Sequence, residues 1–303
     1  MWSCFDVDQQ LSSTKHDLIH RLNTWNLKGE PIKSFISNPL HKNIKAQIYT
    51  EPQSQMMILR TRLTGHLDSG CCVVCTDPEI QDSYAIKCME AFVIQIAFVD
   101  FQNFHSLASV PVVAVEHLIN LNAKYGTVQK FGSMAHSFGC FLSHEVIEEL
   151  RNAPEIPAPV GYYFDYLNES DVDVVDDNYP HSSRYRPRAW FERLINKMPN
   201  LCLRTETDDQ KLVAFEFMQH TGMLHHLFVL PEHRQKGLGH ALELRFVQSL
   251  VSGTYDGSPI IPHKRVVVTN EEGSEFTFSK SQTKLWTWDQ VTSVALMYDS
   301  PTK

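Results

Sequence analysis

Long hydrophobic runs are missing from this 303-residue chain. A helix that spans a bilayer needs about 18 consecutive apolar residues, and the longest apolar stretch, AFVIQIAFV at 91–99, is interrupted by Gln95. The N-terminus, MWSCFDVDQQ, carries two aspartates and no basic segment ahead of an apolar one. It therefore predicts neither a signal peptide nor a transit peptide. We expect a protein without a membrane span that works inside the cell.

An excess of positive charge is also missing. Lys and Arg total 27 against 35 Asp and Glu, so the formal net charge at pH 7 is -8. Broad nucleic-acid binding needs a basic face that neutralises phosphates, so the composition argues against a nucleic-acid partner and leaves room only for a local anion pocket. Hydrophobic residues make up 43% of the chain, which supports one large domain or two ordinary ones.

Cysteines and histidines do not fall at the spacings of a metal site. The seven cysteines are an odd, scattered set, which indicates reduced thiols in an intracellular compartment. The cluster CCVVC at 71–75 invites a metal or redox interpretation, but it lacks a second pair at zinc spacing and lies in a β-branched run, so we favour a buried strand. No carboxylate or thiolate completes a ligand set with His225, His226, His233 and His240. We predict no metal.

The familiar signatures of nucleotide-binding and serine-nucleophile enzymes are absent too. No G-x-x-x-x-G-K-[ST] occurs, and no G-x-S-x-G. GLGHAL at 237–242 lacks the third glycine of a dinucleotide fingerprint, and six polar residues separate it from the strand before it. Cys202 lies in the middle of the strand-like LCLR and is better explained as core than as a nucleophile.

The pattern of apolar runs predicts two α/β domains. APEIPAPVG at 153–161 has three prolines in six residues, so it is neither helix nor central strand. We therefore predict an N-terminal α/β domain over 1–152, a linker over 153–160 and a second domain over 161–303. In the first domain the pattern predicts a helix over 9–28, strands at 45–50, 56–63, 71–77 and 93–98, and helices at 115–126 and 144–152.

The second domain has the clearer pattern. Strands are predicted at 161–167, in LCLRTE, LVAFEFMQ and MLHHLFVL, at 264–270 and at 291–298, and helices at 169–179, 186–200, in ALELRFVQSLVS and in SEFTFSKSQTKLW. His220, Thr221 and Gly222 form the predicted hairpin turn between the second and third of three antiparallel strands. The order predicts a mixed α/β sheet.

The stretch LFVLPEHRQKGLGHALE at 227–243 places two glycines between a strand and a helix. The first turn of a helix leaves backbone N–H groups without partners, and they attract an anion such as a phosphate. Gly237 and Gly239 allow a phosphate to approach the backbone, and Arg234 and Lys236 add positive charge at its rim. This physics predicts an anion-binding loop.

The same residues carry a resemblance. Arg234-Gln235-Lys236-Gly237-Leu238-Gly239 matches Q/R-x-x-G-x-G/A and resembles the acetyl-CoA pyrophosphate loop of the GNAT acyltransferase superfamily. Residues 160–290 resemble the vertebrate glycine N-acyltransferase family. The matching motifs are Met198–Arg204, Thr221-Gly222, Leu230-Pro231-Glu232-His233-Arg234, Thr269-Asn270-Glu271, Trp286 and Trp288.

The resemblance implies a GNAT fold in the C-terminal half, with the N-terminal domain as a candidate degenerate copy. It also implies transfer of an acyl group from acyl-CoA, as co-substrate, to glycine or a similar small amine. The expected cofactor-binding residues are the backbone of Val229 and Leu230, the loop from Arg234 to Gly239 (Arg234, Gln235, Lys236, Gly237, Leu238 and Gly239), and His240 and Asn270. Asn270 either bonds the pantetheine arm or forms a turn. The family suggests mitochondria where the N-terminus does not, so the compartment is cytoplasmic or mitochondrial.

Two positions depart from the family pattern. The glutamate that follows Thr-Gly in the family, its proposed base, is Met223 here, and the superfamily's tyrosine acid falls near Phe278. His225 and His226 are the candidate replacements, because an imidazole with a pKa near ~6.5 is a competent base at neutral pH; the alternative is a pair of inert strand residues. Glu216 is the third catalytic candidate, with a solvent-facing strand position as its alternative. The sequence thus leaves an N-acyltransferase and a non-catalytic acyl-CoA-binding or scaffolding protein open.

Overall fold

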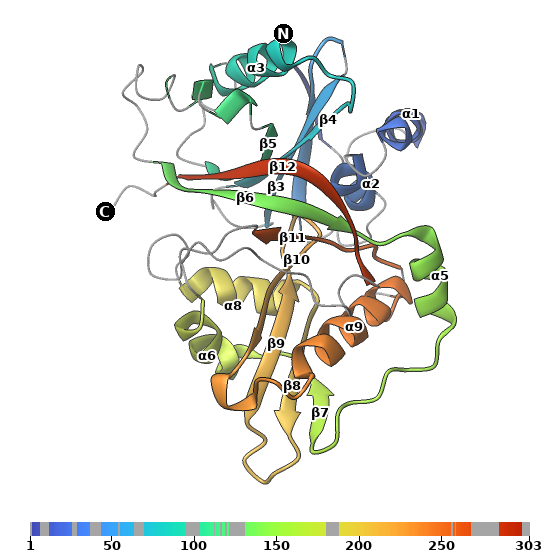
Figure 1. The fold of residues 1–303 in the computed structure, drawn as a ribbon, viewed down its shortest axis with the longest axis vertical. Helices are drawn as coiled ribbons and strands as arrows, with labels where there is room; N and C mark the ends of the chain where they lie inside the picture. The colour runs from blue at the N-terminus through green and yellow to red at the C-terminus, as the bar shows by residue number, and fades with distance from the viewer. Residues whose placement is uncertain are drawn as a thin grey trace. The chain divides into compact units, whose positions relative to one another are not determined.

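The computed structural model describes residues 2–6, 12–25, 29–36, 44–53, 55–63, 70–94, 104–111, 113–115, 117–118, 120, 131–179, 188–255, 257, 259–267 and 285–298. They form two compact units (Figure 1). The first unit contains residues 1–139, 265–276 and 288–303, and the second contains 140–264 and 277–287. Among the described residues, none of the helices combines the length and apolar character that a bilayer crossing requires.

The boundary between the units differs from the one that the prolines predict. The predicted linker, 153–160, lies inside the second unit. The side chain of Gln248 holds it there: Nε2 donates to the carbonyl of Pro154 at 2.9 Å, and Oε1 accepts from the amide of Ile156 at 3.0 Å. The strand predicted at 291–298 belongs to β12 (Thr287–Tyr298), most of which lies in the first unit. A proline-rich segment therefore need not separate two units when a buried polar side chain binds its backbone.

The first unit is built on a mixed sheet with the strand order β1-β2-β3-β4-β5-β12-β6. Consecutive strands are antiparallel up to β4, and β4 and β5 are parallel with α3 between them in the chain. The elements are β1 (Ser3–Asp6), α1 (Ser12–Thr24), α2 (Glu30–Ile36), β2 (Ile44–Thr50), β3 (Met56–Leu63), β4 (Gly70–Thr76), α3 (Asp82–Phe92), β5 (Phe104–Pro111) and β6 (Phe131–Phe141).

The elements of the first unit agree only in part with those predicted from the sequence. CCVVC forms β4, with Cys72 and Cys75 buried, so the prediction of a buried strand is confirmed. The start of the strand predicted at 93–98 is wrong, because Val93 continues α3 with φ -62° and ψ -46°. Strands β5 and β6 and helix α3 were not predicted.

The second unit is a sheet with the order β7-β8-β9-β10-β11. Neighbours are antiparallel up to β10, and β10 and β11 are parallel with α9 between them in the chain. Its elements are α5 (His144–Asn152), β7 (Tyr162–Asp165), η6 (Glu169–Asp171), α6 (Val172–Asp177), α8 (Arg188–Lys197), β8 (Asn200–Thr205), β9 (Leu212–Met218), β10 (Met223–Val229), η7 (Pro231–His233), α9 (Leu238–Val251) and the first two residues, His263 and Lys264, of β11 (His263–Val267). This confirms the mixed α/β class and the predicted order of three antiparallel strands followed by a helix and a further strand.

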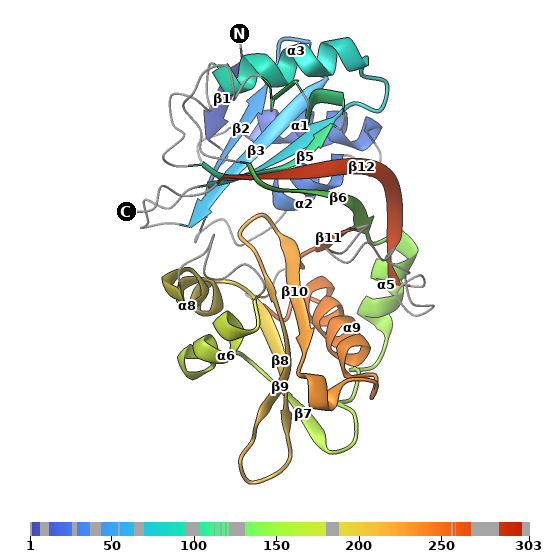
Figure 2. The same ribbon diagram turned by 60° about the vertical axis from the view of Figure 1, so that its left-hand side comes forward.

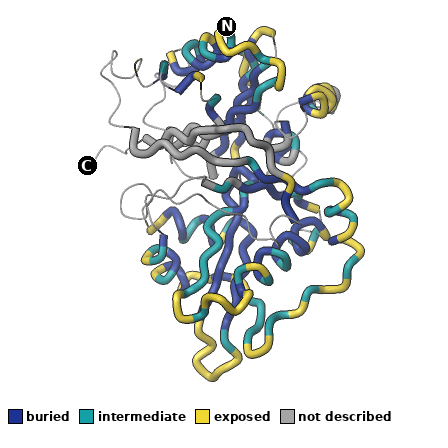
Figure 3. The backbone as a smooth tube through the Cα atoms, in the orientation of Figure 1, coloured by how far each residue is buried: buried dark blue, intermediate teal, exposed yellow. Residues whose placement is uncertain are grey.

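Helices cover both faces of the second sheet. Helices α6 and α8 lie on one face and α9 lies on the other (Figures 1 and 2). All seven residues of β9 are consequently buried, and the dark stretches of β9 and α9 in Figure 3 mark the core of this unit. Glu216 is among them at 2% exposure, so the solvent-facing alternative for this residue is wrong.

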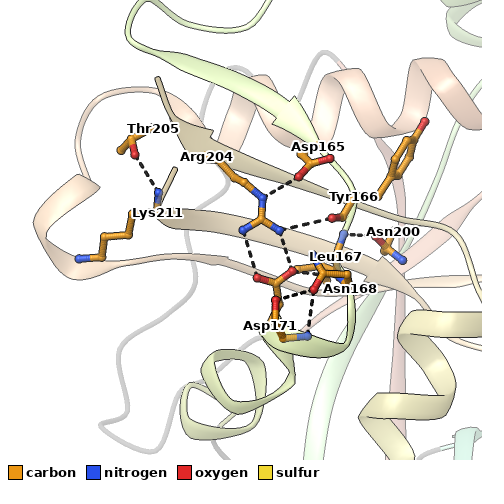
Figure 4. Close-up of polar contacts among 10 residues, drawn as sticks. Asp165, Tyr166, Leu167, Asn168, Asp171, Asn200, Arg204, Thr205 and Lys211 are labelled. Carbon is orange, nitrogen blue, oxygen red and sulfur yellow. Dashed lines mark hydrogen bonds and ion pairs between the residues drawn. The ribbon is translucent and has the colours of Figure 1, made fainter. Parts of the chain in front are cut away.

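An ion-pair network fixes the start of α6 on the sheet (Figure 4). The guanidinium of Arg204 on β8 donates to Asp165 at 2.6 Å and to both carboxylate oxygens of Asp171 at 2.7 and 3.1 Å. Asp171 also accepts from the amide of Asn168, whose side chain accepts from Ser170 and closes a capping box. A bidentate contact of this kind holds orientation as well as distance, so the segment that leads to Tyr179 is anchored firmly.

Candidate functional site

The loop between β10 and α9 ends in a helix N-terminus that has no side-chain cap. Gly237 is the N-cap residue, with the left-handed φ of 75°, and Gln235 is also left-handed at 62°. The first bond of the helix runs from the amide of Ala241 to the carbonyl of Gly237 at 3.1 Å. The amides of Leu238, Gly239 and His240 precede that bond, so they point out along the positive end of the helix dipole. This arrangement can bind an anion.

The cations of the loop are held by neighbouring groups. Arg234 donates from Nε to the carbonyl of Val229 at 3.0 Å and lies 5.5 Å from the centroid of Phe228. Lys236 donates to the hydroxyl of Tyr162 at 3.4 Å, and that hydroxyl lies 3.0 Å from Nδ1 of His233. Burial, followed by the charge of Lys236, lowers the pKa of His233. Two fixed positive charges therefore flank the helix N-terminus.

The two glycines of the loop have different roles. A Cβ at Gly237 would meet no atom within 4 Å, so a glycine is needed here for its positive φ and not for lack of space. A Cβ at Gly239 would lie 3.3 Å from Cγ2 of Val229 and 3.9 Å from Cδ2 of Leu227. Gly239 therefore lets α9 pack closely on β10. Leu238 between them is 2% exposed, so only its backbone can face a ligand.

One edge of β10 is unpaired along most of its length. In the described part of the chain, β10 pairs with β11 only at Met223 and Leu224. On the other edge, the amide of Leu230 donates to the carbonyl of Val213 at 2.9 Å. Because amides alternate between the two edges of a strand, the amide of Val229 faces the edge of β10 that is opposite to β9. Of the two amides predicted to polarise a thioester, Val229 can do so, and Leu230 is engaged with β9.

A β-bulge brings both candidate histidines to one face of the sheet. The register between β9 and β10 shifts between His225 and Phe228, so that His226 and Leu227 lie opposite Glu216. His226 has φ 58°, the left-handed conformation that bulges often contain. Regular alternation would place neighbouring side chains on opposite faces. Here the ring centroids of His225 and His226 lie 5.6 and 4.8 Å from that of Tyr179.

Tyr179 is the partner that the sequence did not reveal. Its hydroxyl lies 2.9 Å from Nε2 of His225, and either group can donate, according to the histidine tautomer. Tyr179 is 8% exposed, and its ring packs edge-on against Phe191 at 5.2 Å. A phenol and an imidazole at this distance can pass a proton. No local motif marks Tyr179, because it follows an acidic helix remote in sequence from β10.

Glu216 does not join the histidines. Its neighbours Phe215 and Phe217 contact the histidine rings, so the carboxyl group of Glu216 points to the opposite face, towards α9. Burial raises its pKa well above the usual range, and the nearby charge of Glu243 adds to the shift while Lys264 opposes it. The sequence grouped three catalytic candidates, and the structure separates them across the sheet.

The remaining predicted positions lie on β10, on α9 or outside the described residues. Met223 begins β10 as a half-buried residue and offers no proton acceptor. His240 lies in the first turn of α9. Asn270 and Phe278 lie outside the described residues. Among the residues that the structure covers, no three His, Cys, Asp or Glu side chains are grouped to hold a metal ion.

The first unit repeats the strand order without these features. Strands β1–β5 follow the directions of β7–β11, with α3 in the place of α9. The register between β3 and β4 contains no shift, and β4 pairs with β5 from Gly70 to Val73. Helix α3 begins with Asp82, an acidic residue where an anion would need positive potential. In the described chain, the first unit therefore lacks the glycine loop and a bulge between the strands equivalent to β9 and β10, and its own register shifts lie between β4 and β5 and between β12 and β5.

Comparisons with known proteins give structural neighbours only. No family model matches the sequence, and no curated protein matches it. A Drosophila protein of known structure is 15% identical, with a TM-score of 0.62, over 96% of this chain and 98% of that chain. A GCN5-related N-acetyltransferase from Kribbella flavida is 10% identical, with a TM-score of 0.43, over 97% and 98% of the two chains.

A tandem GNAT protein from the clavulanic acid biosynthesis pathway is 10% identical, with a TM-score of 0.42, and both chains are covered completely, at 100% each. The likeness to the Drosophila protein shows a shared fold. The TM-scores of the two acetyltransferases are too low to support a conclusion about this chain.

Proposed function

We propose that this protein is an acyl-CoA-dependent N-acyltransferase whose acceptor is glycine or a similar small amine. One observation carries the proposal: the unpaired edge of β10 leads directly into the uncapped N-terminus of α9. A strand edge offers amides to an extended, amide-containing chain, and a helix N-terminus attracts phosphate. Coenzyme A consists of an amide-containing pantetheine arm joined to a diphosphate. The identity of the acceptor rests on the resemblance of residues 160–290 to the glycine N-acyltransferases.

Each part of the coenzyme has a place in the second unit. The amides of Leu238, Gly239 and His240 bind the diphosphate, with Arg234 and Lys236 beside it. The pantetheine arm lies along the edge of β10 beyond Leu224. The thioester carbonyl accepts from the amide of Val229, which stabilises the oxyanion that forms during transfer. The loop thereby fixes the reactive carbon next to the bulge.

The bulge supplies the proton acceptor. The amine attacks the thioester carbon, a C–N bond forms, the C–S bond breaks, and the sulfur departs as a thiolate. The amine must lose a proton in this sequence, and the thiolate gains one. His225 takes the proton from the nitrogen, and Tyr179, bonded to His225 at 2.9 Å, supplies one to the sulfur. Tyr179 thus takes the role that the family assigns to a tyrosine near Phe278.

A second candidate function is retained because of Met223. This residue stands where the family has its proposed base, and it cannot accept a proton. If His225 is inert, the same loop makes a non-catalytic acyl-CoA-binding or scaffolding protein. Both candidates require the coenzyme to bind, and only the first requires the C–S bond to break.

The test combines calorimetry with a thiol assay. CoA and acetyl-CoA are titrated into the protein, and free CoA release from acetyl-CoA and benzoyl-CoA is followed with glycine and with a panel of simple amines. Binding together with amine-dependent thiol release supports the transferase. Binding without release, unchanged in His225→Ala, supports the non-catalytic protein. No binding of either compound refutes both.

A further inference from the structure

A buried cluster of charge lies beneath the bulge, on the α9 face of the second sheet. Lys264 on β11 forms an ion pair with Glu243 on α9, and the two side chains are 9% and 1% exposed. The ammonium group also lies 4.8 Å from the centroid of the Trp286 ring. Glu216 on β9 completes the cluster as a carboxyl group 2% exposed, and its Oε2 has no hydrogen-bond partner among the described residues. Three elements of one unit, β9, α9 and β11, together with Trp286, therefore contribute to this cluster.

Stability alone does not account for this cluster. Removing two charges from water costs several kcal/mol per ion, and replacing a buried pair with apolar residues of similar size is often neutral or stabilising. A sheet face packed against a helix would ordinarily meet apolar side chains, such as Leu242, Phe246 and Leu250 of α9. An ion pair, unlike an apolar contact, fixes one atom against another and so sets register.

The position of the Glu243–Lys264 ion pair indicates which elements it holds in register, namely α9 and β11. Lys264 belongs to the last pair between β10 and β11, opposite Leu224. Beyond it, no described residue pairs with this edge of β10. Glu243 lies in the second turn of α9, the helix whose first turn bears Gly237 and Gly239. The ion pair therefore links the strand at the point of divergence to the helix that begins with the anion-binding loop.

We propose that Glu243 and Lys264 are positioning residues that hold the diverging edge of β10 at the spacing a pantetheine arm needs. The inference rests on the proposed function, and it assigns different roles in binding to two parts of the site. The loop amides recognise the diphosphate, and the buried ion pair governs access to the strand edge. Loss of the pair should therefore weaken the binding of a ligand that uses the edge more than that of a ligand that uses the loop alone.

Two probes separate these contributions. CoA carries both the diphosphate and the pantetheine arm, whereas ADP carries a diphosphate without the arm. Their dissociation constants are measured by calorimetry for the wild-type protein and for Glu243→Leu/Lys264→Met, which replaces the pair by apolar side chains of similar length. The control is Glu192→Leu/Arg188→Met, which removes the exposed ion pair on α8. Circular dichroism and the melting temperature report folding.

The expected result is a split between the probes. In the double variant the Kd for CoA rises about tenfold or more, that for ADP stays within about threefold, and the control variant matches the wild type. If the apolar variant does not fold, Glu243→Gln/Lys264→Gln, which keeps a hydrogen bond without charge, should show a smaller rise confined to CoA. Equal changes for CoA and ADP, or no change for either, would overturn the inference. Failure of the wild-type protein to bind either probe would refute the proposed function, and the inference with it.

Discussion

The backbone of His226 decides which groups share the candidate site. A left-handed φ is uncommon outside glycine and costs roughly 1–3 kcal/mol at a non-glycine residue. His226 adopts this conformation with φ 58°, and the bulge turns the side chains of His225 and His226 towards Tyr179. On a regular strand, successive side chains point to opposite faces, so one of the two histidine rings would have pointed towards α9. The sequence names both histidines, but it contains no signal for the bulge that pairs them.

Tyr179 and His225 should act as one unit. Tyr179→Phe removes the hydroxyl bonded to His225 and leaves the ring packed on Phe191. We expect it to lower turnover about 10- to 100-fold and to leave the Kd for CoA unchanged, because the loop is untouched. His225→Ala should lower turnover more than CoA affinity.

Steady-state kinetics on the two single variants and the double variant test the coupling. A double variant no slower than the worse single variant is expected. Tyr166→Phe, at a residue 49% exposed, is the control and should behave as wild type. Fully additive losses would show that the two side chains act separately.

At the level of elements, patterned apolar runs were predictable and the contacts between elements were not. LVAFEFMQ and MLHHLFVL predict β9 and β10 because their runs are bounded by polar turns. FGSMAHSFGCF, which forms β6, mixes glycine, serine and histidine with apolar residues and gives no such signal. Whether Glu216 is buried depends on whether a helix covers its face of the sheet, and the sequence of β9 alone contains no information about that helix. Buried polar residues such as Glu216 and Gln248 are therefore found only in the structure.

The packing of α9 on β10 can be tested at Gly239. Gly239→Ala places a methyl group 3.3 Å from Cγ2 of Val229, so the helix must move away from the strand or the strand must yield. We expect a loss of roughly 1–3 kcal/mol in unfolding free energy and weaker CoA binding. Adding Val229→Ala to this variant removes the contact with Cγ2 and should restore part of the unfolding free energy and part of the CoA affinity. No recovery in the double variant, measured by denaturant unfolding and calorimetry, would contradict the packing role.

The buried carboxyl of Glu216 should make stability fall as pH rises. A raised folded pKa means that the folded state holds its proton more tightly than the unfolded state does. The resulting stability is complete below the unfolded pKa, near 4.5, and is lost as pH rises through the folded pKa. The slope can reach about 1.4 kcal/mol per pH unit.

Glu216→Gln should flatten this part of the curve. Glu243, Lys264 and Cys140 surround the same cluster, and burial raises the pKa of Cys140 to about 11, so the comparison belongs below pH 9. Urea unfolding at several pH values measures the difference, with Glu232→Gln at a surface ion pair as control. Identical pH profiles for Glu216→Gln and wild type would show that Glu216 ionises normally.

At the level of the whole molecule, two units share a strand order and differ in their backbone irregularities. Among the residues that the structure describes, β4 and β5 pair at four positions from Gly70 to Val73, whereas β10 and β11 pair at two. The first unit also has Asp82 in the first turn of α3, and the second has an uncapped glycine. We therefore expect one CoA site in each chain. Calorimetry should give a stoichiometry near one, and a value near two would place a second site in the first unit.

We propose above that the amides at the start of α9 bind the diphosphate of a coenzyme A thioester. The most direct test is calorimetric titration of CoA into wild type, Gly237→Asp and Gly161→Asp. Both glycines have positive φ, at 75° and 83°, and a Cβ at either meets nothing within 4 Å, so the two variants carry the same backbone strain and charge. We expect CoA to bind wild type and Gly161→Asp alike and not to bind Gly237→Asp. Equal binding by all three proteins, or no heat with wild type, would contradict it.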